Sequence, residues 1–293
     1  MEHEYATYPR RFDGYRWYKP LLVGVLFVVF ALLVNLVAVD LITEAIFGTR
    51  VQSTGYDDMD FYSAAGAFYQ CVSAASVIPC LLLAAVIVRD RPISSYFSSM
   101  GGWRWRVFFK TFAVGLVLVA LPLAVSSLLP GKTGPVRFTL GGFLILTLLA
   151  PFQGVGEELV FRSYIMQTTS SWFKLPIVGL IVQVIVFAAV HPYNIVGVIN
   201  IAIAAVIYAL ICLFTKGLEA GSALHILNNM TEIYMAGFGF GAITSEQTVR
   251  DIAIELVAKV LFFLFILYAG RKLHWFDEVK CDDVARFNEK KKK

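Results

Sequence analysis

Long runs of apolar residues, separated by short polar segments, dominate the chain. A helix needs about 20 mostly apolar residues to cross the hydrocarbon core of a bilayer. Eight runs approach or exceed that length, at 20–42, 63–88, 107–129, 138–160, 175–191, 196–214, 218–236 and 252–270. They lack the alternation of apolar and polar residues that is typical of a membrane β-barrel. The pattern predicts an all-α membrane protein, a polytopic bundle of about eight transmembrane helices.

Composition agrees with this prediction. Apolar residues make up 58% of the 293 residues and charged residues 16%, against about 25% charged residues in a soluble domain. A soluble chain of this size could not cover its surface with so few polar groups. The first run is too long for a signal-peptide core and has no small-residue cleavage site, so we expect it to remain as the first span. We interpret 1–293 as a single integral-membrane domain of the cell membrane.

The distribution of positive charge predicts the orientation. With the N-terminus on the cytoplasmic side and eight spans, 20 Lys and Arg residues fall on the cytoplasmic side and 4 on the other. Such an excess marks cytoplasmic segments. Both termini are therefore predicted to be cytoplasmic, with loosely ordered basic tails at 1–19 and 271–293. Basic clusters beside a span contact anionic lipid more often than nucleic acid, so we expect a lipid-bilayer partner and no nucleic acid. The oligomeric state stays open.

Ionisable residues inside the spans are few, and such residues are costly and often functional. Three of them are interpreted as structural: Lys110 and Lys259 lie where their ammonium groups could reach the membrane surface, and Glu255 lies one helical turn from Lys259. Glu232 is left unassigned. The remaining five form three short patterns, each in its own span.

The first pattern lies in the fourth span. Glu158 and Arg162 are four residues apart, so they share a helix face and are predicted to form an ion pair. Glu157 is rotated by about 100° from Glu158 and is left free for another role.

The other two patterns carry histidines. The fifth span ends with His191, one turn after Phe187, and the seventh carries His225 and, four residues later, Asn229. Glu157 and His191 lie 17 residues before and after Lys174, so a helical hairpin that turns at Lys174 would place them at one level. His225 reaches that level only if this hairpin projects about 10 Å further than the turn near Lys216, at the helical rise. Pro192 predicts a break directly after His191.

This set of residues could hydrolyse an amide bond. A buried carboxylate can act as general base on water, and a histidine can assist it. A second histidine with an amide can bind a developing oxyanion. Glu157, His191 and His225 are also zinc ligands by type, and zinc would activate water as well, but no HExxH spacing occurs. The sequence leaves both alternatives, with and without metal, open.

The three patterns together resemble the motifs of the CPBP family, the CAAX-protease and bacteriocin-processing intramembrane proteases. The resemblance covers about residues 138–236, the motif-bearing core, and the eight spans agree with it. It implies that Glu157 is the catalytic base assisted by His191, that Glu158 and Arg162 orient the site, and that His225 and Asn229 stabilise the oxyanion. It leaves the need for a metal open.

We therefore predict an intramembrane endopeptidase that cleaves a membrane-associated or lipid-anchored peptide or protein near the cytoplasmic face. A non-catalytic immunity or scaffold protein of the same family is the alternative, since the family includes bacteriocin maturation and self-immunity proteins. A proton-coupled transporter that uses the buried carboxylates is a weaker alternative, because no inverted repeat is visible in the chain. No residue identifies the substrate.

Overall fold

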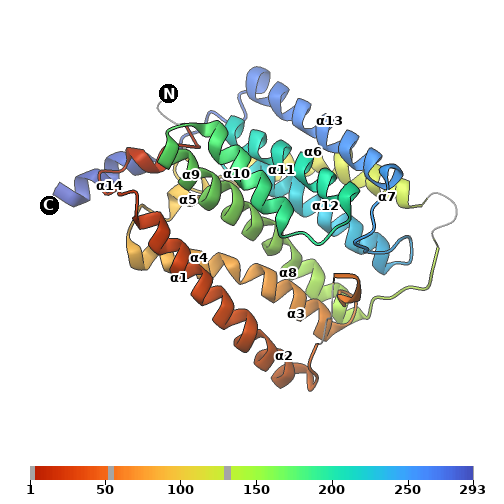
Figure 1. Cartoon of the computed structure of the whole chain (residues 1–293). Helices are drawn as coiled ribbons and strands as arrows, with labels where there is room; N and C mark the ends of the chain where they lie inside the picture. Colours follow the sequence, from red (N-terminus) through yellow and green to blue (C-terminus); the bar gives the residue numbers. More distant parts are fainter. Residues whose placement is uncertain (1–3, 52–55, 129–132, 293) are drawn as a thin grey trace.

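The protein is an all-helical bundle in the computed structural model, which describes residues 4–51, 56–128 and 133–292 (Figure 1). Within these residues there is no β-strand, only an isolated bridge between Ser98 and Gly217. The all-α prediction is confirmed. Eight helical rods correspond to the eight predicted spans.

Four of the rods are continuous stacks of shorter helical segments. They are α1 (Lys19–Leu33) with the π-helix η2 (Val34–Ala38) and α2 (Val39–Phe47), then α3 (Ala64–Ala75) with α4 (Val77–Val88), then α6 (Trp105–Gly115) with the π-helix η4 (Leu116–Ala120) and α7 (Leu121–Ser127), then α8 (Leu140–Glu158) with the π-helix η5 (Leu159–Ile165) and α9 (Met166–Phe173). The others are α10 (Pro176–Ala189), α11 (Ile195–Thr215), α12 (Glu219–Gly237) and α13 (Val249–Leu273). Four short helices lie outside the rods: η1 (Tyr8–Arg11), η3 (Tyr56–Asp58), α5 (Ser94–Phe97) and α14 (Asp283–Lys292).

Six of these rods are long and apolar enough to cross a membrane: Lys19–Phe47, Ala64–Val88, Trp105–Ser127, Leu140–Phe173, Ile195–Thr215 and Ile252–Leu273. The predicted spans 175–191 and 218–236 are helices too, but α10 has only 14 residues and α12 carries several polar side chains. The count of eight crossings is therefore not confirmed. The fourth span is longer than predicted, since its helix continues from Leu140 to Phe173.

Both termini lie at one end of the bundle, which we call the basic end; it also carries the turns at Lys174 and Lys216 (Figure 1). A chain that passes through the bundle an even number of times begins and ends on the same side. Which membrane face the basic end adopts stays a prediction.

The described parts of the two tails, residues 4–19 and 271–292, are not loosely ordered, contrary to the prediction. Tyr5, Tyr8 and Phe12 are buried, and Gln167 Nε2 on α9 donates a hydrogen bond to the carbonyl oxygen of Tyr5 at 2.9 Å. The ring centroids of Phe12 and Phe287 lie 5.4 Å apart, which joins the two tails. The aromatic side chains of the first tail bury enough apolar surface to order it, which a count of charges alone does not register.

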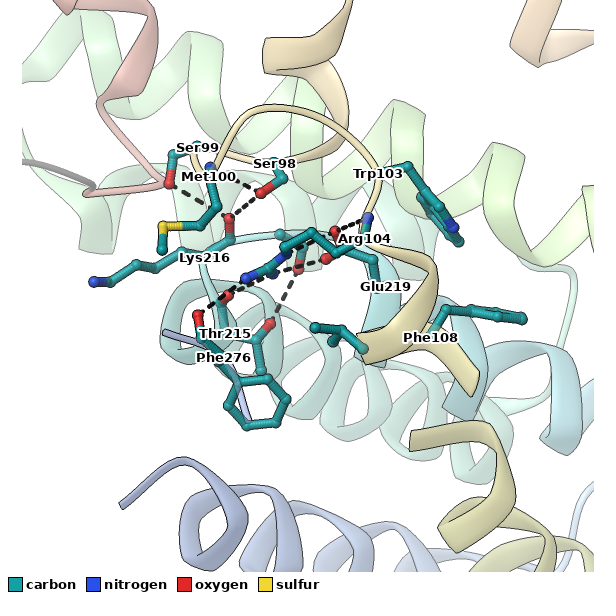
Figure 2. A network of polar contacts seen from close by, with 12 residues as sticks. Ser98, Ser99, Met100, Trp103, Arg104, Phe108, Thr215, Lys216, Glu219 and Phe276 are labelled. Atoms are coloured by element: carbon teal, nitrogen blue, oxygen red, sulfur yellow. Dashed lines mark hydrogen bonds and ion pairs between the residues drawn. The ribbon is translucent and has the colours of Figure 1, made fainter. Parts of the chain in front are cut away.

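Helix α12 is buried along most of its length and packs against α6, α8 and α11. Its first turn is fixed by the network in Figure 2, in which Arg104 and Glu219 form a buried, bidentate ion pair. The guanidinium also donates to the carbonyl oxygens of Thr215 and Phe276 at 2.7 and 3.1 Å. Each of its three nitrogens therefore has an acceptor, as a buried charge requires. This network sets where α12 begins, six residues before His225.

Candidate active site

The two predicted histidines come together at Glu157, at the point where α8, α10 and α12 meet. Glu157 Oε2 lies 3.6 Å from His225 Nε2 and 4.0 Å from His191 Nε2. The equal spacing of Glu157 and His191 from Lys174 thus predicted their common level correctly. Lys174 has a left-handed φ of 60° and ends α9, so the hairpin turns where it was expected.

A close approach of α8 and α12 makes this geometry possible. Gly154 faces Ile226, where an added Cβ would lie 2.8 Å from Ile226 Cγ1 and 3.2 Å from its backbone nitrogen. The absence of a side chain at Gly154 lets the helix backbones come this near. Glu157 lies one helical turn after Gly154, and His225 directly precedes Ile226, so both lie beside this crossing point.

Glu158 is held as predicted, and it also orients His225. Glu158 Oε1 lies 3.3 Å from Arg162 Nη1, and both side chains are completely buried. The Arg162 guanidinium also stacks against the rings of Phe187 and Tyr208, with its central carbon 4.3 and 5.1 Å from their centroids. The same Glu158 oxygen lies 2.9 Å from His225 Nδ1. Because a carboxylate only accepts, Nδ1 is the protonated nitrogen of this pair.

His191 is oriented in the same way by a different acceptor. Its Nδ1 lies 2.6 Å from the carbonyl oxygen of Phe187, and a carbonyl can only accept, so Nδ1 carries the proton. Both histidines therefore direct Nε2 towards Glu157. The break at Pro192 occurs as predicted, since α10 ends at Ala189 and α11 begins at Ile195.

Glu157 itself has one oxygen engaged and one free. Oε1 accepts a hydrogen bond from Gln153 Nε2 at 3.1 Å. Oε2 has no hydrogen-bond partner within the part of the chain that the structure describes, although this oxygen is buried. An unpaired buried carboxylate oxygen is costly, and such exceptions in a polar cavity mark sites where a further group binds.

The free oxygen faces a cavity of about 410 Å³. Glu157, His191, His225 and Asn229 all line it. The lining also includes residues of the segments 59–61, 190–193 and 243–247, which lie at the end of the bundle opposite to the basic end. Helix α12 forms part of the cavity wall. At the helical rise, it extends about 18 Å from His225 to the last residue of the helix. The cavity thus extends from Glu157 towards the end of the bundle away from the termini.

A protein-family model described as "Type II CAAX prenyl endopeptidase Rce1-like" matches residues 139–231. This segment, which we call the Rce1-like segment, is therefore similar to a family of CAAX-type proteases. No curated protein and no solved structure matches the chain. The Rce1-like segment contains every site residue named above, and it begins and ends within 5 residues of the predicted core 138–236.

The Rce1-like segment does not present a ready metal site. Glu157, His191 and His225 are suitable ligands by type, but among the described residues no group of three or more His, Cys, Asp or Glu side chains is arranged to hold a metal ion. Both imidazoles are oriented by protein acceptors, and each has only Nε2 left for binding. We derive no step through a metal, and zinc stays a prediction that metal analysis would test.

Several residues of the site were not predicted. Gln153 could have been found, since it precedes Glu157 by one turn on the same face. Tyr208, whose ring stacks on His225 at 5.0 Å with an interplanar angle of 19°, gives no signal in an apolar run. The π-helix that follows Glu158 was also missed; such insertions often occur at functional sites.

The prediction for Lys259 was wrong. Its side chain does not reach the membrane surface but is buried, 1% exposed, and pairs with Glu255 inside the bundle. Both residues line the cavity, together with Glu232. Lys110, by contrast, is exposed, with its ammonium 5.2 Å from the ring centre of Trp275.

Proposed function

We propose that the chain is an intramembrane endopeptidase that uses Glu157 to activate water. The observation that supports this most strongly is the single unpartnered oxygen of Glu157, directed at the Nε2 atoms of two histidines beside a cavity. The match of residues 139–231 to the Rce1-like protease family also supports this proposal. The membrane-embedded helices favour a membrane-associated or lipid-anchored peptide as the substrate.

The nucleophile would be a water molecule between Glu157 and His191. With its Nδ1 proton held by Phe187, His191 offers the Nε2 lone pair, so a water can donate one hydrogen bond to His191 and the other to Glu157 Oε2. The 4.0 Å between these acceptors is suited to one bridging water. Glu157 takes the proton as the water oxygen attacks the peptide carbonyl carbon, and then delivers it to the leaving amine.

His225 and Asn229 would stabilise the oxyanion that forms. Asn228 Nδ2 donates weakly to Asn229 Oδ1 at 3.5 Å, which leaves the Nδ2 of Asn229 as its donor end. His225 faces the cavity with Nε2, and when this nitrogen is protonated it can donate to the oxyanion. Glu158 holds the other side of the ring and, being fully buried beside Arg162, keeps it in one orientation.

The test is hydrolysis of a lipid-anchored peptide library by the purified protein in lipid vesicles. Replacement of Glu157 by Gln should reduce kcat by at least about 100-fold, the usual contribution of a general base. The matched control is Glu278→Gln, since Glu278 is exposed in the C-terminal tail. Undiminished cleavage by the Glu157 variant would exclude the assigned role. Full complementation of a deletion strain by folded Glu157→Ala and His225→Ala variants would favour the non-catalytic immunity or scaffold function instead.

A further inference from the structure

The cavity continues beyond the hydrolytic residues along one face of α12. His225, Asn228, Asn229 and Glu232 are spaced i, i+3, i+4 and i+7, so they follow one side of the helix. All four line the same cavity. At the helical rise, Glu232 lies about 10 Å further along α12 than His225.

Around Glu232 the cavity is lined by a second polar group that the hydrolytic mechanism does not use. Asn200 on α11 donates to Glu255 Oε2 at 2.8 Å, and Lys259 on α13 bonds to Glu255 Oε1. Asn200, Glu255 and Lys259 are 4%, 6% and 1% exposed, so they do not face lipid. We call Asn200, Asn228, Glu232, Glu255 and Lys259 the Glu232 subsite.

Two amide oxygens of this subsite have no partner. Asn200 and Asn228 each give an Nδ2 proton to a carboxylate, Glu255 and Glu232 respectively. Because a carboxylate only accepts, these bonds fix which way both amides point. The Oδ1 atoms that remain are buried and have no hydrogen-bond partner among the described residues. Buried acceptors in a polar cavity call for donors, which a bound ligand can supply.

The charges of the subsite show which ligand would suit it. Lys259 neutralises Glu255, while no described Lys, Arg or His forms an ion pair with Glu232. With both carboxylates ionised, two carboxylates against one ammonium give the subsite a net formal charge of −1. A cationic group that donates several hydrogen bonds would satisfy both the unpaired carboxylate and the free amide oxygens.

We propose that the Glu232 subsite binds a cationic group of the substrate peptide, either a Lys or Arg side chain or a free N-terminal ammonium. The 10 Å along α12 equals about three residues of extended chain, so this group lies about three residues from the scissile bond. The inference rests on the proposed endopeptidase function, since it assigns the specificity of that same cavity.

The experiment compares lipid-anchored peptides that differ only at the third residue on either side of the scissile bond. Each position carries Lys, its neutral isostere norleucine, or Glu; a separate pair has a free or an acetylated N-terminus three residues from the cleaved bond. We expect the cationic peptide to exceed norleucine by about tenfold or more in kcat/KM, with Glu slowest. The position and the pair that show the effect identify which cationic group is bound.

The Glu232→Gln variant tests the assignment to this residue, with Glu278→Gln as the matched control. The ratio of kcat/KM for the Lys and norleucine peptides should fall to below about twofold in the first variant and be retained in the second. Equal rates for Lys and norleucine in the unaltered protein would overturn the proposal, and so would a ratio that survives in a folded Glu232→Gln protein. The unaltered protein alone decides the first point even if the variant does not fold.

Binding separates this inference from the hydrolytic one. The Glu157→Gln protein, which keeps the Glu232 subsite, should bind the Lys peptide about tenfold more tightly than the norleucine peptide in a fluorescence anisotropy titration. Selective binding without hydrolysis by the unaltered protein would remove the endopeptidase proposal and retain the cationic subsite. Hydrolysis without selectivity for the cationic peptide would remove the cationic subsite and retain the endopeptidase proposal.

Discussion

The pair of Glu158 and Arg162 provides the sharpest test of how the site is held together. Both side chains are completely buried, and their charged atoms lie 3.3 Å apart. At an effective dielectric constant of about 20, this distance corresponds to about 5 kcal/mol of gross attraction. No other carboxylate forms an ion pair with Arg162 in the described chain, and the aromatic faces of Phe187 and Tyr208 replace only part of that energy.

We predict strong coupling between the two residues in a double-mutant cycle. Glu158→Gln leaves a buried cation without its counter-charge, and Arg162→Met does the same to the carboxylate. Each single change should lower the free energy of unfolding by about 3–5 kcal/mol. In the double variant no charge is stranded, and Met packs well against aromatic rings, so the loss should be about 2 kcal/mol or less. The measurement is unfolding by SDS titration in mixed micelles.

Activity should respond differently from stability. The double variant regains its fold, but the charge behind His225 Nδ1 is gone, so kcat should be about 100-fold or more below that of the unaltered protein. A double variant as unstable as the sum of the single ones would show that Glu158 and Arg162 act through separate contacts. A double variant with full activity would show that Glu158 does not orient His225 for catalysis.

Three further predictions concern the helix crossing, the first turn of α12 and the membrane orientation. Gly154→Ala should push α12 away through Ile226, lowering kcat by about tenfold or more with a smaller change in KM, because a small displacement of reacting groups is costly; steady-state kinetics would show it. Arg104→Met should cost about 3–5 kcal/mol of unfolding free energy, since it strands Glu219, and a second Glu219→Gln change should recover part of this in the same SDS titration. In intact cells, a Glu246→Cys variant should react with a membrane-impermeant maleimide, whereas a cysteine in the C-terminal tail should react only after permeabilisation; the reverse pattern would contradict the charge-based orientation.

Sequence reasoning succeeded where the signal is local or periodic. The helical spacing of Glu158 and Arg162 predicted their ion pair, and equal distances from Lys174 predicted that Glu157 and His191 meet. The hairpin at Lys174 also projects further along the bundle than the turn at Lys216, as expected. Glu157 lies 17 residues from Lys174 and His225 nine from Lys216, yet their side chains are 3.6 Å apart. These inferences needed only the geometry of a helix.

What could not be predicted depends on contacts between distant helices. That Glu158 orients His225 requires the crossing angle of α8 and α12, which no spacing contains. The burial of Lys259 was missed for a related reason: its depth along α13 is readable, but the face it presents depends on where α11 and α12 pack. The ordered N-terminal tail follows from a surface that only the folded hairpin creates.

The position of the cavity sharpens the question of where the substrate enters. By helical rise, His225 lies about 13 Å from the turn at Lys216 and about 18 Å from the last residue of α12. The cavity, however, extends the other way, to the segments 59–61, 190–193 and 243–247. If the basic end is cytoplasmic, as the charge count predicts, the cavity extends towards the opposite face of the membrane. Labelling Glu246→Cys therefore tests which face of the membrane the cavity extends towards.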